Sequence, residues 1–421
     1  MIDINSKLSD KFDNKIILFS LISIPFFLIT GPFIPDLIIS TITIYFVYYS
    51  IKLKDYSVIK NKYFKIFLFF LFFSILASAL SDFKLYSLKT SLSYLRFGIF
   101  VVVFYIVISR QKNSLFYLWN ILLFCFIILV FDGYYQFIFK KNIFGFEIQG
   151  QRLSSFFGDE LILGSYLSRF LPLIYSLYFL PAVKSKVKFK FLFHIIIILS
   201  IILIYLSGER AALFYIFASL IFLLITLNSH KKIILYKIVI FILSFLIFLN
   251  FNQGVRERIL NQTVNEFGFK SEKVYIFSSN HEGHYLATID LIKKNIIFGI
   301  GPKNFRKYCY SDTKYSKLPY ICTSHPHNTY LQLFLETGIF GFIIVLSIFL
   351  NFCFKILKHI FSKIKYRKGR YNDFQLCLIC CFFITLWPFI PSGNFFNNFL
   401  SIIYFYPVAL FLYSMNLNRK E

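Results

Sequence analysis

The sequence predicts an all-α polytopic membrane protein with about twelve transmembrane helices. Of its 421 residues, 57% are hydrophobic, 59 are phenylalanine and only 15% are charged, a balance that a soluble protein of this size could not bury. The apolar residues form many continuous runs of roughly 18–22, the length at which a helix crosses a bilayer. Because these runs do not alternate between polar and apolar residues, a β-barrel is disfavoured.

The predicted spans fall into two groups separated by a long hydrophilic segment. Residues 1–250 hold nine spans, at 16–30, 32–51, 64–80, 88–109, 114–131, 161–181, 191–206, 211–228 and 233–250, with a medium outer loop near 132–160. Residues 251–337 form a large outer loop with short helices, ending in a helix that lies in the membrane interface. Residues 338–421 hold the last three spans, at 338–354, 374–390 and 397–414, and a tail.

The basic residues set the expected orientation. The formal net charge is +25, but the termini and the connections on one side of the predicted spans hold 26 of the 45 lysines and arginines. Positive charge concentrates on the cytoplasmic side of membrane proteins, so we expect both termini in the cytoplasm. Long outer segments translocate largely regardless of charge, so the basic residues of 251–327 fit this topology. The basic excess therefore indicates membrane topology, and no nucleic-acid partner is expected.

Two of the seven cysteines lie in the large outer loop. Cys309 and Cys322 are 13 residues apart, and an oxidising outer compartment makes a disulfide between them plausible. The other five lie in or beside predicted spans, where packing is their expected role.

A polar cluster precedes the tenth predicted span. His325, Pro326, His327 and Asn328 end the outer loop, and the proline keeps His325 out of a helical conformation. Asn328 is a good helix N-cap residue. We therefore expect His327 at the lipid boundary, where a neutral imidazole can act as a general base near neutral pH. The cluster could instead be a polar cap that only anchors the helix at the headgroups.

The helix that follows carries three further residues of interest. Glu336 lies on the side of the helix near His327 and could orient a histidine or bind substrate. Gly338 and Gly341, one turn apart, allow a bend or a close helix contact.

Six arginines are candidates for binding an anionic group at the outer face. Arg152, Arg210, Arg256 and Arg258 fall in outer segments, whereas Arg96 and Arg169 fall inside spans, roughly eight to nine residues from the outer ends. The planar guanidinium fork binds phosphate through two hydrogen bonds. Arg210 is held in a very short turn, Ser207-Gly-Glu-Arg210. The alternatives are snorkelling to the interface for Arg96 and Arg169, and a solvated helix face for Arg256 and Arg258.

The sequence lacks the common motifs that bind nucleotides or nucleotide sugars. It contains no Asp-x-Asp pair, no Walker A loop and no dinucleotide fingerprint. Neither a metal nor a nucleotide cofactor is therefore expected, and an activated lipid-linked pyrophosphate would supply the energy for a transfer.

Four outer segments, in this chain order, carry a family resemblance. They are Arg152-Leu-Ser-Ser-Phe-Phe-Gly158, Ser207-Gly-Glu-Arg210-Ala-Ala-Leu, Phe298-Gly-Ile-Gly-Pro-Lys-Asn-Phe305, and His327-Asn328 followed after nine residues by Gly338-Ile-Phe-Gly341. Together they resemble the bacterial O-antigen ligases and their relatives, the lipid-linked polysaccharide polymerases. The resemblance covers roughly residues 145–345. The family often continues its arginine loop as Gly-x-Pro-Asn, whereas this chain has Gly158-Asp-Glu-Leu161, so the roles of Asp159 and Glu160 stay open. The family's final Thr-Thr is absent too, since Phe342-Ile343 stands there.

The resemblance implies a periplasmic glycosyltransferase in the bacterial inner membrane. The donor would be an O-antigen glycan on undecaprenyl pyrophosphate, and the acceptor the lipid A-core, which gives lipopolysaccharide. Carried over to this chain, His327 would activate the acceptor hydroxyl. Arg210 would bind the departing pyrophosphate, with Arg152 as a helper. Direct displacement would invert the anomeric carbon, with no metal or nucleotide.

Two other functions remain open on the sequence. A polymerase would use the same donor and the same residues but a different acceptor. A transporter or flippase for the lipid-linked glycan belongs to another class, and Arg96 and Arg169 would then line its path. No repeated halves or paired broken helices favour transport.

Overall fold

The computed structural model describes residues 6–269, 275, 277–317 and 321–417. Within these ranges the chain forms helices and two isolated β-bridges, with no β-strand. The N-terminal half contains α1 (Ser6–Asp10), α2 (Lys15–Ile22), α3 (Ile24–Phe27), η1 (Leu28–Thr30), α4 (Phe33–Lys52), η2 (Ser57–Lys60), α5 (Lys62–Leu80), α6 (Lys84–Ser93), α7 (Leu95–Arg110), α8 (Ser114–Phe139), η3 (Ser155–Phe157), α9 (Leu163–Phe179), α10 (Pro181–Lys184) and α11 (Lys190–Leu206).

The C-terminal half contains α12 (Arg210–Thr226), α13 (Lys231–Phe251), α14 (Gln253–Val255), η4 (Arg256–Asn261), α15 (Gln262–Glu266), α16 (Ser279–Lys294), α17 (Phe305–Ser311), α18 (Thr329–Tyr366), α19 (Asp373–Thr385) and α20 (Asn398–Leu417). Each predicted span overlaps helical structure, although α19 ends at Thr385, before the predicted end of its span at 390, and the span at 16–30 is divided among α2, α3 and η1. In the described part of the chain, seven helices or joined helix pairs are long and apolar enough to cross a membrane: 33–52, 62–80, 84–110, 114–139, 231–251, 329–366 and 398–417.

The end of α8 differs from the sequence prediction. The span was expected to stop at 131, but α8 continues to Phe139. The reason is that its last turns bury two polar side chains against the following loop. Asp132 accepts hydrogen bonds from the backbone N–H of Ile143 and the hydroxyl of Ser155, and Gln136 accepts one from the backbone N–H of Ser155. These polar residues therefore belong to the helix, and the medium loop begins near residue 140.

The helix α9 lies at the centre of the bundle. From Tyr166 to Tyr178 all its residues are buried, and it packs against α8, α11, α12 and α19. The helices α7 and α20 pack against each other, and α20 also packs against α19. Outer helices such as α13 expose apolar side chains along their length, including Leu243, Ile247 and Phe251, as expected for contact with lipid.

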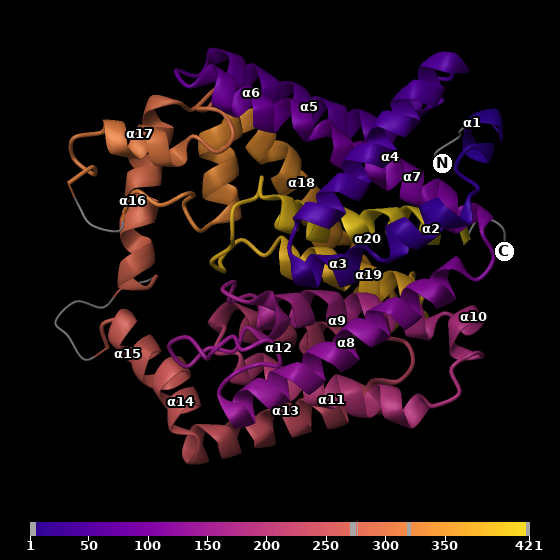
Figure 1. The fold of residues 1–421 in the computed structure, drawn as a ribbon, viewed down its shortest axis with the longest axis vertical. Coiled ribbons are helices and arrows are strands. Elements are labelled where there is room, and N and C mark those ends of the chain that lie inside the picture. The colour runs from indigo at the N-terminus through magenta and orange to yellow at the C-terminus, as the bar shows by residue number, and fades with distance from the viewer. Residues whose placement is uncertain (1–5, 270–274, 276, 318–320, 418–421) are drawn as a thin grey trace.

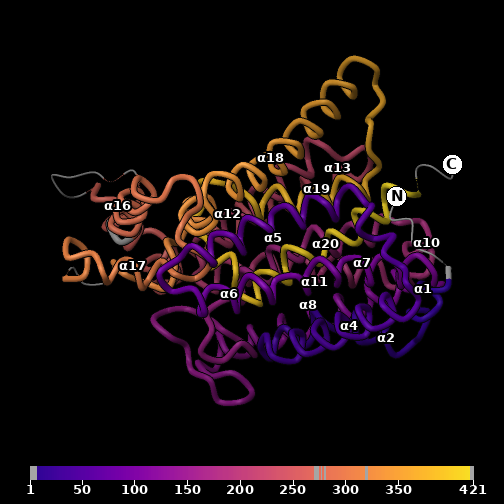
Figure 2. Tube along the Cα trace, turned by 90° about the horizontal axis from the view of Figure 1, so that it is seen from above, coloured from indigo at the N-terminus to yellow at the C-terminus, as the bar shows by residue number. Residues whose placement is uncertain are grey.

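The two ends of the bundle differ in character. The helix α1 lies at one end of the bundle, and α16 and α17 lie at the other (Figures 1 and 2). The first described helix and the helices of the large loop are thus at opposite ends.

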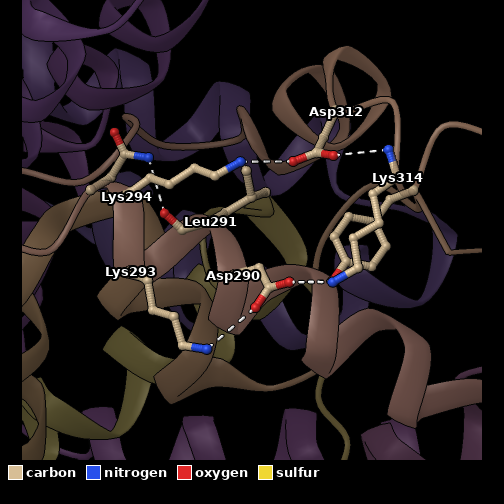
Figure 3. A network of polar contacts seen from close by, with 8 residues as sticks. Asp290, Leu291, Lys293, Lys294, Asp312 and Lys314 are labelled. Carbon is tan, nitrogen blue, oxygen red and sulfur yellow. Dashed lines mark hydrogen bonds and ion pairs between the residues drawn. The ribbon is translucent and has the colours of Figure 1, made fainter.

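The large loop is a packed structure. A hydrophobic cluster joins α16, the turn before α17 and the start of α18 through Leu291, Ile300, Phe305 and Leu335. Cys309 and Cys322 form a disulfide, as the sequence made plausible. On the surface, ion pairs join α16 to the segment after α17: Lys294 with Asp312, and Asp290 with Lys314 (Figure 3). Exposed pairs contribute little stability, so the apolar cluster and the disulfide hold the loop together.

A break in α18 positions the functional segment. Gly338 has φ 66° and ψ −173°, so a short helix ends before it and a long one begins after it. The turn containing Gly299 packs into this break, and the backbone N–H of Ile300 donates to the carbonyl of Leu335. A Cβ on Gly338 would lie 2.1 Å from the carbonyl oxygen of Ile297, so only glycine fits. The bend that the sequence suggested at this glycine is present.

Candidate active site

The segment before α18 holds His327 in a strained position. Asn328 caps the helix, since its side-chain oxygen accepts from the backbone N–H groups of Tyr330 and Leu331. His327 has φ 58°, a left-handed conformation that costs energy for a residue with a Cβ. Its carbonyl accepts from the backbone N–H of Ser392, in the loop before α20. The helix cap at Asn328 and the hydrogen bond from Ser392 therefore maintain this strained backbone conformation.

The two histidines of this segment differ in what their rings can do. His325 is buried, with Nδ1 2.9 Å from the hydroxyl of Ser324 and Nε2 3.2 Å from the carbonyl oxygen of Ser392. A carbonyl only accepts, so Nε2 carries the proton and Nδ1 accepts from the hydroxyl. Both nitrogens of His325 are thus used within the protein. The His327 ring is partly exposed and makes no hydrogen bond to the described residues, so a substrate can reach it.

Two more histidines come to the same place from α16. The ring centroids of His281 and His284 lie 5.6 and 5.2 Å from that of His327, and His325 lies 4.1 Å from it. Nδ1 of His284 donates to the carbonyl oxygen of Ile321. Across the described ranges, no group of three or more His, Cys, Asp or Glu residues is arranged to hold a metal ion.

Crowding keeps these rings neutral. Burial, followed by the charges of the neighbouring histidines, lowers the pKa of His327 to about 3. Burial likewise lowers the pKa values of His281 and His325 to about 4, and that of His284 below its usual value. At neutral pH the His327 ring therefore carries a free lone pair, which a general base requires.

A second polar site is built around the turn between α11 and α12. Glu209 is buried and accepts hydrogen bonds from the backbone N–H groups of Gly164 and Ser165, so it caps the central helix α9. Gly208 has φ 69°, and a Cβ there would lie 3.1 Å from Cγ of Arg152 and 3.3 Å from Cγ of Arg258. The two arginine stems therefore pack on this glycine.

Three guanidinium groups gather at this turn. Arg258 donates to the carbonyl oxygen of Gly208, and Arg152 donates to that of Leu161. Burial lowers the pKa of each, and the charge of Arg210 lowers both further. The Arg152 and Arg258 stems thus pack on the turn that Arg210 follows directly in the chain, and Glu209 partly offsets the lowered pKa of Arg152.

Arg210 itself is paired with an acidic residue of the large loop. Its Nη2 lies 2.9 and 2.7 Å from the two carboxylate oxygens of Glu266, and its Nη1 lies 3.3 Å from the hydroxyl of Thr263. His281 lies within electrostatic reach of both members of this pair, because Glu266 raises its pKa and Arg210 lowers it.

The other predicted binding residues lie elsewhere. Arg96 pairs with Asp36 at 2.7 Å and donates to Asn398. Arg169 is buried on α9, where it donates to the hydroxyl of Tyr215. Arg256 is exposed on η4. The structure therefore brings three of the six arginines together at the turn.

Glu336 is buried away from the histidine rings. Its carboxylate accepts from the side-chain amide of Gln332 and from the backbone N–H of Phe305. It fastens the turn before α17 to α18. Gly341 packs on Thr337, whose hydroxyl a Cβ would meet at 2.1 Å.

Sequence reasoning did not single out four residues of the site: Thr263, Glu266, His281 and His284. A signal for the histidines was present, since the spacing His281-x-x-His284 puts both on one helix face. Nothing local marks Glu266, because its partner Arg210 is 56 residues away.

Comparison with known proteins gives one family match, over part of the chain. Residues 195–346 match the family model described as O-antigen ligase. The match contains Arg210, Glu266, the histidines and the glycine break, and Arg152 lies before it. No curated protein matches the chain. Residues 195–346 thus carry an O-antigen ligase domain, and the described part of the chain contains seven helices or joined helix pairs that are long and apolar enough to cross a membrane.

Proposed function

We propose that this protein transfers an O-antigen glycan from undecaprenyl pyrophosphate to the lipid A-core on the periplasmic face of the bacterial inner membrane. Both termini lie in the cytoplasm in this proposal. The observation that carries it is the pairing of two sites at the loop end of the bundle: three arginines around Gly208, and a neutral, accessible His327. The arginines suit a pyrophosphate, and His327 suits a hydroxyl group.

The arginines bind the donor and stabilise its leaving group. Arg210 holds the pyrophosphate with Arg152 and Arg258 beside it, since guanidinium groups form charge-assisted hydrogen bonds to phosphate oxygens. Negative charge grows on the pyrophosphate as the glycosidic bond breaks, and preorganised cations stabilise that charge most strongly at the transition state.

His327 activates the acceptor. A sugar hydroxyl is a poor nucleophile until its proton is removed. The acceptor oxygen attacks the anomeric carbon, its proton passes to His327, and the bonding electrons leave with undecaprenyl pyrophosphate. Attack opposite the leaving group inverts the anomeric carbon. The bond to pyrophosphate supplies the driving force, so the proposal assigns no step to a metal or a nucleotide.

Deletion of the gene tests the proposal. The surface polysaccharide of the deletion strain, separated on a gel, should consist of core without attached chains, while lipid-linked polymer accumulates. Core that carries a single repeat would instead show a polymerase. An unchanged polysaccharide would reject both functions.

A further inference from the structure

Glu266 binds the guanidinium group of Arg210, to which the proposed function assigns the pyrophosphate of the donor. Both oxygens of its carboxylate contact Nη2 of Arg210, at 2.9 and 2.7 Å. The two side chains are partly exposed, at 28% for Arg210 and 20% for Glu266. A guanidinium group binds a phosphate through the same donors, so this edge of Arg210 cannot hold Glu266 and a phosphate together.

Glu209, the other carboxylate near this turn, has a structural role. Glu209 holds two backbone N–H groups at the start of α9, and its loss would uncap the central helix. In the described part of the chain, by contrast, the hydrogen bonds of the Glu266 carboxylate go to Arg210. Glu266 is therefore the carboxylate at this turn that can leave without disturbing a helix end.

The segment that carries Glu266 also carries a cation of the site. The helices η4 and α15 run from Arg256 to Glu266, and Arg258 is fixed by its hydrogen bonds to Gly208 and Gln262. One short stretch thus supplies a charge that attracts a pyrophosphate and a charge that competes with it.

We propose that Glu266 is an internal substitute for the donor: it holds Arg210 when the site is empty, and the pyrophosphate of the donor displaces it. This inference rests on the proposed function, because the incoming anion is the donor's pyrophosphate. The contact keeps Arg210 extended in its binding position and lowers donor affinity. After transfer, the return of Glu266 to Arg210 helps to release undecaprenyl pyrophosphate.

Binding measurements with the full-length protein in detergent test this competition, with undecaprenyl pyrophosphate as the probe. Glu266→Gln removes the competing charge and should tighten binding roughly fivefold, since binding no longer has to break the ion pair. Glu266→Asp keeps the charge but shortens its reach, and should tighten binding by a smaller factor. It serves as the test if the glutamine variant does not fold.

Glu257→Gln is the matched control. Glu257 lies on the same segment, and its carboxylate accepts from Asn261. Its replacement removes the same charge without freeing Arg210, so binding should stay at the wild-type level. Equal tightening in both glutamine variants would show a general charge effect and overturn the inference. Unchanged or weaker binding in the Glu266 variants would overturn it as well.

A further variant separates failure of the inference from failure of the proposed function. Arg210→Gln should lose most of the affinity for the probe. If the wild type and Arg210→Gln bind equally, or the wild type does not bind, the proposed role of Arg210 is wrong. If Arg210→Gln loses binding while the Glu266 variants match the wild type, only the role of Glu266 is wrong.

Discussion

Acidification should loosen α16 from the segment that carries His327. The perturbation is a change from pH 7.5 to pH 5. Four histidine rings meet there, and every one has a pKa below its usual value because of burial. The charged groups that act on them are Glu266, Arg210 and Arg306. Protonation therefore places several positive charges in a small space with one carboxylate nearby.

The sign and size follow from proton linkage. When α16 is detached, each histidine binds a proton near pH 6.5, whereas His327 in place binds one near pH 3. The stability of the packed site is thus complete above about pH 6.5 and is lost as the pH falls toward 3. At pH 5 the loss is about 2 kcal/mol for His327, reduced to about 1 kcal/mol because the ring is partly exposed. The other three rings act in the same direction.

Hydrogen–deuterium exchange measures this effect directly. After correction for the intrinsic pH dependence of exchange, amides of residues 283–292 should exchange at least about tenfold faster at pH 5 than at pH 7.5, by the same linkage. Residues 342–352, in the long part of α18, are the control and should not change. The variant His281→Gln has one titrating ring fewer and should lose part of the response. Equal protection of α16 at the two pH values would refute the reasoning.

Three further predictions concern single residues. Arg210→Lys should lower the transfer rate at least about tenfold in a reconstituted assay, because lysine lacks the two-pronged fork; near-normal rates would mean that charge alone suffices. Gly338→Ala should lower the free energy of unfolding by more than about 2 kcal/mol, through its left-handed φ and the contact with Ile297. Gly145 also has a positive φ, of 90°, but a Cβ there meets no atom within 4 Å, so Gly145→Ala measures the backbone strain alone. An equal loss of stability in both variants, measured by thermal unfolding, would contradict the predicted contribution of the contact with Ile297. Cys309 and Cys322 should resist alkylation unless a reductant is added, and labelling of both without one would contradict the disulfide.

The helices were predictable because their signal is local. A run of apolar residues long enough to cross a bilayer predicts a helix from composition alone. The end of α8 was missed for the opposite reason. Asp132 and Gln136 looked like the start of a loop, but hydrogen bonds from the loop itself bury them.

The candidate site was predictable where one short segment carries the information. The spacing from His327 to Gly338 distinguished His327 from His325, and the structure adds a physical reason, since both nitrogens of His325 are engaged. Contacts between distant segments were not predictable. Arg96 was expected in the anion site, but Asp36, 60 positions earlier, pairs with it. Glu266 reaches Arg210 only because the large loop folds back over the turn between α11 and α12.

Transfer by purified protein tests the central claim most directly. The wild type and His327→Ala are reconstituted with an undecaprenyl-pyrophosphate-linked glycan and lipid A-core, and the product is followed on a gel, with donor binding measured in parallel. We predict that the wild type forms glycosylated lipid A-core, and that His327→Ala binds the donor normally but forms no product. Normal product from His327→Ala would contradict the role of the histidine. Joining of donor glycans to one another by the wild type, with lipid A-core untouched, would contradict the assignment as a ligase.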